Sequence, residues 1–98
     1  MFDMTPEEAY NFVVNLGLSR DKRAEEDIMT DPEYSYWYAH DIIKGRFPEA
    51  EPVLMKDPYW AYWYASNIIE GRWMEAEPHI KRHNNWWTMY KHRFNIDE

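Results

Sequence analysis

The sequence repeats itself with a period of 26 residues, and this repeat constrains the fold more than any other feature. Residues 31–56 and 57–82 are identical at 14 of 26 positions. A weaker copy begins at Thr5, and a truncated fourth copy begins at His83. Self-similarity at a fixed period is typical of stacked arrays, in which each unit buries its apolar face against its neighbours. We therefore expect a single domain, residues 1–98, built from units at 5–30, 31–56 and 57–82 and a capping helix at 83–95.

Each unit is expected to contain two helices. Asp31 and Asp57 are suited to the N-cap, and the proline after each is suited to the first helical position. Gly45 and Gly71 are expected to end these helices as C-terminal glycines. A shorter helix follows, and we find no alternating pattern typical of strands. The predicted fold class is all-α: a small solenoid-like stack of helix pairs with three copies and a truncated fourth.

The repeated phrase is strongly aromatic, and 18% of the whole chain is Phe, Trp or Tyr. At 100° per residue, Tyr38 and Tyr64 fall on the apolar arc of their helices and should be core. Trp37 and Trp63 fall on the polar arc. Two interpretations stay open for this pair. Either it is covered, by the short helix of an adjoining unit or by stacking of Arg46 and Arg72, or it forms an aromatic ladder for a partner.

The net charge is −7, and residues 1–30 contain seven acids against three bases. Direct binding of nucleic acid is not expected, because such binding depends on clustered Lys and Arg. The acidic N-terminal half suggests the opposite role, a mimic of nucleic acid that occupies a basic groove on a partner protein. The acids proposed for that contact are Asp21, Glu25, Glu26 and Asp27.

The sequence contains no convincing catalytic or metal-ligating set. His79 and His83 have an i, i+4 spacing, but no third ligand is evident and the chain has no cysteine. Ser35 and His40 diverge around their helix, so they do not form a nucleophile–base pair. We therefore predict no enzyme activity, no cofactor and no metal site.

The apolar stretches are too short to span a bilayer. The N-terminus, MFDMTPEEAY, has neither a basic segment nor an apolar run of signal-peptide length. From these two features we expect a soluble cytoplasmic protein that does not associate with membranes.

The phrase YWYAxxIIxGRxxEAEP, at residues 36–52 and again at 62–78, resembles a short tandem repeat of uncharacterised bacteriophage and giant-virus proteins. This chain departs from that repeat by carrying Ile-Ile in place of Val-Ile, and Phe47 in place of one tryptophan. The resemblance covers residues 31–82 well and residues 5–30 poorly. It implies a viral accessory protein acting in the host cytoplasm, and it carries no catalytic residues.

Two functions follow as expectations. The first is a non-enzymatic protein-binding module, namely a phage-encoded inhibitor of a host defence or nucleic-acid-processing protein. It would act through the acidic N-terminal half or through an aromatic face that includes Trp37, Trp63, Arg46 and Arg72. The alternative is a structural or assembly protein that stacks or self-associates through its repeats.

Overall fold

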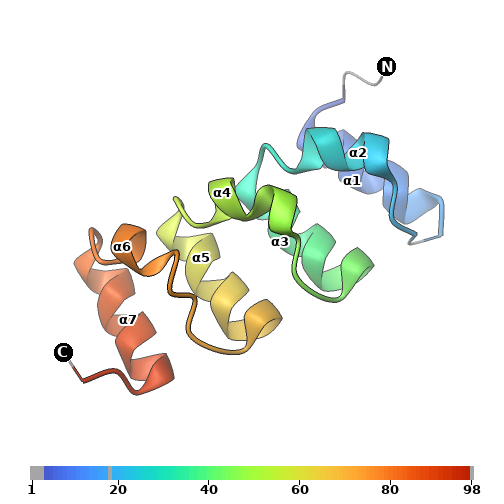
Figure 1. Cartoon of the computed structure of the whole chain (residues 1–98). Coiled ribbons are helices and arrows are strands. Elements are labelled where there is room, and N and C mark those ends of the chain that lie inside the picture. The colour runs from blue at the N-terminus through green and yellow to red at the C-terminus, as the bar shows by residue number, and fades with distance from the viewer. Residues whose placement is uncertain (1–3, 18, 98) are drawn as a thin grey trace.

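The computed structural model describes residues 4–17 and 19–97, and in this part of the chain all regular structure is helical. The helices form a stack of steps, with the chain termini at opposite ends (Figure 1). The molecule is elongated, measuring 46 × 21 × 17 Å along its principal axes. This arrangement confirms the predicted all-α stack of helix pairs.

In the first three copies the longer helix begins at a capped N-terminus, as the sequence predicts. Thr5 forms a capping box with Glu8, and the side chains of Asp31 and Asp57 accept hydrogen bonds from first-turn amides. These side chains satisfy donors that a helix start otherwise leaves unpaired. The helices that follow are α1 (Pro6–Asn15), α3 (Pro32–Tyr38), α5 (Pro58–Tyr64) and, after His83, α7 (Asn84–Phe94).

The ends of these helices differ from the prediction. Helices α3 and α5 continue into π-helical turns, η1 (Ala39–Ile43) and η3 (Ala65–Ile69). The last turn closes with the amide of Lys44 bonded to the carbonyl of Ala39, five residues back, at 2.7 Å. Lys44 and Glu70 then adopt the left-handed conformation, with φ of 60° and 61°. The helices thus end within two residues of Gly45 and Gly71, which were expected to end them, but the left-handed residue is the one before each glycine.

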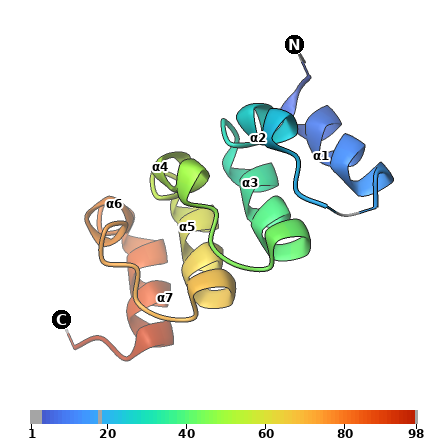
Figure 2. The same ribbon diagram turned by 45° about the vertical axis from the view of Figure 1, so that its right-hand side comes forward.

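The shorter helices lie along one edge of the stack, as Figure 2 shows. They are α2 (Lys22–Ile28), α4 (Glu51–Leu54), which follows the 3₁₀ turn η2 (Pro48–Ala50), and α6 (Glu77–Ile80). Most of the packing between units joins consecutive longer helices and the short helix between them. Each unit therefore contributes one long and one short helix.

The core lies between the two kinds of helix, and its largest fully buried side chains are aromatic. Tyr38 and Tyr64 are fully buried, as predicted. The ring of Tyr38 packs on Phe47 at 5.2 Å, and the ring of Tyr64 packs on Trp73 at 4.9 Å. Each aromatic side chain buries a large area, which lets a short chain assemble a core from few residues.

Candidate functional site: polar clasps and an aromatic groove

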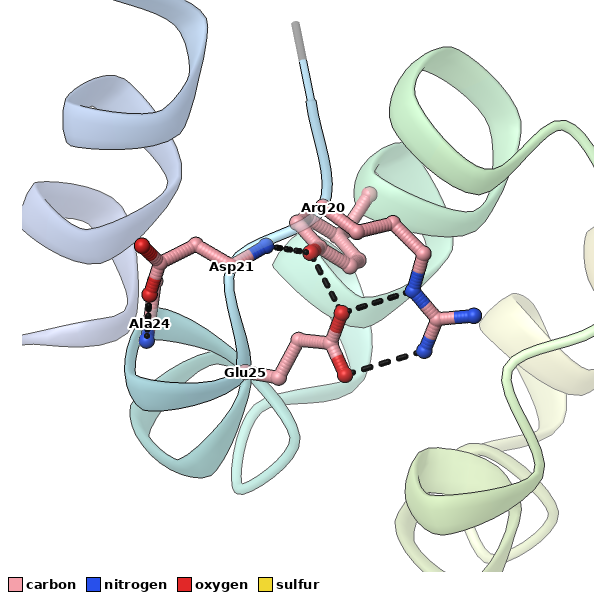
Figure 3. A network of polar contacts seen from close by, with 5 residues as sticks. Arg20, Asp21, Ala24 and Glu25 are labelled. Atoms are coloured by element: carbon pink, nitrogen blue, oxygen red, sulfur yellow. Dashed lines mark hydrogen bonds and ion pairs between the residues drawn. The ribbon is translucent and has the colours of Figure 1, made fainter. Parts of the chain in front are cut away.

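A network of Arg, Glu and Tyr joins the first copy to the second (Figure 3). Arg20, just before α2, donates two hydrogen bonds to Glu25 at 2.8 and 2.9 Å. The hydroxyl of Tyr38, from α3, donates to Glu25 at 2.6 Å and accepts from the amide of Asp21 at 3.0 Å. Two copies are thus held together by one carboxylate, and we call this arrangement a clasp.

The clasp recurs twice more with the same spacing. Glu51 accepts from Arg46 and from the hydroxyl of Tyr64, which itself accepts from the amide of Phe47 at 2.7 Å. In the third clasp, Glu77 accepts from Arg72 and from the hydroxyl of Tyr90, which accepts from the amide of Trp73 at 2.7 Å. In every clasp the arginine and glutamate come from one copy and the tyrosine from the next.

The clasps shift the pKa values of their members. Burial alone would raise the pKa of Glu25 and Glu51, but the hydrogen bonds from arginine and tyrosine outweigh it and lower both. The bond from Arg72 is the main cause that lowers the pKa of Glu77. Burial, together with the neighbouring carboxylate, raises the pKa of Tyr64. The glutamates therefore remain ionised and the tyrosines remain protonated at neutral pH.

Stacking of Arg46 and Arg72 on the indoles of Trp37 and Trp63 was one of the alternatives left open by the sequence, and the structure shows these arginines bound to glutamates instead. Both guanidinium groups form two-pronged hydrogen bonds with a glutamate of their own copy. Their side chains keep 47% and 40% of their surface exposed on the outer side of the clasps. They are structural residues first, and their contact with a partner stays a prediction.

The four acids proposed as a nucleic-acid mimic do not form one exposed patch. Asp21 caps α2 by accepting from the amide of Ala24 at 2.9 Å. Glu25 is buried in the first clasp, with 7% of its surface exposed. Asp27 is partly buried, and Glu26 is exposed. The sequence shows the four charges, but it does not show that Asp21 and Glu25 stabilise the fold through hydrogen bonds.

Trp37 and Trp63 lie on a groove between α3 and α5. The groove is a hollow of about 260 Å³. We call it the aromatic groove, and it is lined by Tyr36, Trp37, Tyr59, Trp60, Trp63 and Asn67. Trp37 is 38% exposed and Tyr59 is 43% exposed, whereas Trp63 and Trp60 are partly buried. The helical wheel thus placed Trp37 correctly, and neighbouring rings cover part of Trp63.

The rings of the groove contact one another across two copies. The centroids of Trp37 and Trp60 are 6.4 Å apart, and those of Tyr59 and Trp60 are 4.7 Å apart, both edge to face. Asn67 donates a hydrogen bond to the Tyr36 hydroxyl at 2.9 Å, which joins η3 to α3. This bond fixes one wall of the groove.

Tyr59 and Trp60 were missed as candidates, although the sequence carried a signal for them. Tyr59 precedes Trp63 by four residues and therefore shares its helix face. The equivalent residue of the preceding copy is Glu33, so the change to an aromatic residue enlarges the ring cluster in one copy. The cluster also continues into the last copy, where the ring centroid of Trp86 lies 5.2 Å from that of Tyr59.

The described residues contain no group of three or more His, Cys, Asp or Glu placed to hold a metal ion. Within the same residues, no helix has the length and apolar character needed to cross a membrane. No protein-family model, curated protein or solved structure matches this chain.

Proposed function

We propose that this chain is a non-enzymatic protein-binding module and that the aromatic groove is its contact surface. The observation that carries the proposal is the group formed by Trp37, Tyr59 and Trp63, which surrounds a hollow on the outside of the array. Tryptophan and tyrosine are enriched among the residues that dominate binding energy at interfaces. A neighbouring hydrogen bond, between Asn67 and Tyr36, holds the surface in place before any partner arrives.

The aromatic groove is a better candidate than the acidic N-terminal half. Asp21 and Glu25 are engaged in a helix cap and in a clasp, so a partner would have to compete with the fold for their charges. The exposed ring surfaces of Trp37 and Tyr59 require no such competition. We therefore assign the main contact to the groove, and we assign the exposed acids a general attraction for basic partners.

The proposed target is a host protein, and the proposed effect is inhibition by occupying its surface. The resemblance of residues 31–82 to tandem repeats of phage and giant-virus proteins supports this choice. A host defence or nucleic-acid-processing protein fits best, because such proteins carry the basic surfaces that attract an acidic chain.

The test uses the wild-type chain and the double variant Trp37→Asn, Trp63→Asn as baits to capture a partner from host lysate. Calorimetry with the purified partner then measures the binding free energy of each bait. Asparagine is chosen because Asn11 occupies the equivalent position of the first copy. We expect the helical content to persist and the binding free energy to weaken by ~2 kcal/mol or more. Met74→Gln is the matched control, since Met74 is 60% exposed and lies outside the groove. A partner held equally by both baits would overturn the proposal.

The alternative is a structural protein that assembles with itself. One observation argues against end-to-end assembly through further clasps. End-to-end growth through further clasps would require a tyrosine at the position of Phe12, and phenylalanine has no hydroxyl to donate. Sedimentation velocity over a wide concentration range decides the matter. Growth into long oligomers would favour assembly, and a constant sedimentation coefficient would exclude it.

A further inference from the structure

We infer that the aromatic groove receives a cationic side chain, the guanidinium of arginine or the ammonium of lysine, from an exposed segment of the partner. This inference rests on the proposed function and names the chemistry of the partner. It depends on three features: the ring surfaces of the groove, the contacts between lysine side chains and a tryptophan elsewhere in the molecule, and the charge around the groove.

The first feature is the arrangement of the rings. In the described part of the chain the lining consists of five aromatic side chains and one amide, with no charged residue. Trp37 and Trp60 meet at 69° and Tyr59 and Trp60 at 81°, so their faces point in different directions around the hollow. Ring faces carry partial negative charge, and several faces around one space attract a cation more strongly than one face does.

The second feature is a contact of the same kind inside the molecule. The ammonium groups of Lys81 and Lys91 lie 5.1 and 5.9 Å from the ring centroid of Trp87. Both distances are within the range in which a cation is attracted to a ring face. Trp87 of the last copy thus receives one cation from the preceding copy and one from its own, whereas the residues lining the aromatic groove include none.

The third feature is charge complementarity. The chain has a net charge of −7. Glu33 is exposed and precedes Trp37 by four residues, so it shares the helix face of Trp37, which lines the groove, and we call this position the rim of the groove. A second hollow shares Asn67 with the groove and is lined by Lys44 and Glu70, whose charges offset one another. A cation that enters between the rings therefore meets a carboxylate at the rim and an acidic protein overall.

The test uses two short fluorescein-labelled peptides of identical length, in which three arginines alternate with glycine and serine. In the second peptide each arginine is replaced by citrulline, which keeps the shape and removes the charge. Fluorescence anisotropy with the wild-type chain is measured at low and at physiological salt. We expect the arginine peptide to bind about tenfold more tightly or better, since desolvated cation–ring contacts reach ~2 kcal/mol.

Variants separate the groove from general attraction to an acidic protein. The double variant Trp37→Asn, Trp63→Asn keeps the net charge, so its loss of arginine-peptide binding locates the site in the groove. Glu33→Gln should weaken binding about threefold through the lost rim charge. Glu49→Gln removes one exposed acid outside the groove and is the matched control. Circular dichroism confirms that each variant is folded.

The outcomes distinguish this inference from the proposed function. Equal affinity for the arginine and citrulline peptides, or no binding of either, overturns the cation site and leaves the protein-binding groove standing. Arginine binding that persists in the double tryptophan variant also overturns the cation site. Failure of the double variant to weaken capture of the partner overturns the proposed function itself.

Discussion

Single phenol hydroxyls connect the units of this molecule. In each clasp, the hydroxyl of Tyr38, Tyr64 or Tyr90 accepts from a backbone amide and donates to a glutamate. The equivalent residue of the first copy is Phe12, which precedes the first arginine and glutamate of the series. A tyrosine hydroxyl is therefore present in each copy that is preceded by an Arg–Glu pair. The first copy has no such pair before it in this sequence and carries phenylalanine at the same position.

Replacing Tyr64 with Phe removes one hydroxyl and keeps the buried ring. The buried amide of Phe47 then loses its acceptor, and the Oε2 atom of Glu51 keeps only the hydrogen bond from Arg46. We expect the free energy of unfolding to fall by ~1–3 kcal/mol, the cost of unsatisfied buried polar groups. Urea denaturation monitored by circular dichroism measures the change. Tyr59→Phe, at a 43% exposed position, should change stability by less than ~0.5 kcal/mol. Equal effects of the two substitutions would contradict the role given to the clasp.

The clasps also predict the response to acid. The pKa of Glu51 in the folded chain lies below its usual value of 4.5. A carboxylate of this kind contributes stability that is present above the unfolded pKa and is lost as the pH falls through the folded pKa. The stability difference between wild type and Glu51→Gln should therefore be largest at pH 7 and shrink below about pH 4. Denaturation curves at several pH values test this, and a difference that grows on acidification would refute it.

At the scale of the helices, the starts were predictable and the ends were not. A helix start depends on local chemistry, and Thr5, Asp31 and Asp57 act as caps where the sequence places them. The ends depend on how the last turn packs. The spacing of apolar residues does not predict the π-helical turns η1 and η3. After these turns the left-handed conformation falls on Lys44 rather than on Gly45.

This geometry reverses the usual expectation for glycine. Lys44 has φ of 60°, a conformation that costs side-chain-bearing residues ~1–2 kcal/mol, so Lys44→Gly should stabilise the chain by up to ~1 kcal/mol. A Cβ added at Gly45 meets no atom within 4 Å, and its φ is not in the left-handed region. Gly45→Ala should therefore be neutral or stabilise by ~0.4–1 kcal/mol. Thermal unfolding of both variants checks this pair, and strong destabilisation by Gly45→Ala would show that the glycine is the true helix end.

The clasp itself lay beyond sequence reasoning for a physical reason. Tyr38 reaches Glu25 across 13 positions, a contact that depends on how two copies are placed in space. The exact repetition of Arg, Glu and Tyr was visible, but each residue had a simpler local explanation, such as an acid near a helix start. The aromatic groove was half predictable. The helical period placed Trp37 outward, while Trp60 joined the groove only through packing between α3 and α5.

At the scale of the whole molecule, the array is built by repetition of one interface. Inserting a second copy of residues 57–82 after Arg82 would supply a complete further clasp, because the inserted copy brings both its own tyrosine and its own Arg–Glu pair. Stability in such arrays is approximately a sum over units and nearest-neighbour interfaces. We expect the longer chain to remain cooperative and to unfold at a higher temperature and urea concentration.

The control carries the same insertion, but the inserted copy has Phe at the position that corresponds to Tyr64. This change removes one hydroxyl from the new interface. It should gain less stability than the intact insertion. Truncation after Lys56 tests the opposite direction and should leave a largely unfolded chain, because fewer than about three repeats rarely bury enough surface. A truncated chain with a sharp transition near that of the full protein would show that the units are independent.

The placement of the clasps has a mechanical consequence. Each clasp joins one copy to the next, and the chain termini lie at opposite ends of a body 46 Å long (Figure 1). A pulling force applied to the two ends would therefore load the three clasps in series, and the molecule would rupture first at the weakest of them. Each interface would resist the load through its tyrosine hydroxyl, the carboxylate that accepts from it and the core packing around them, so the clasp with the weakest surroundings would open first.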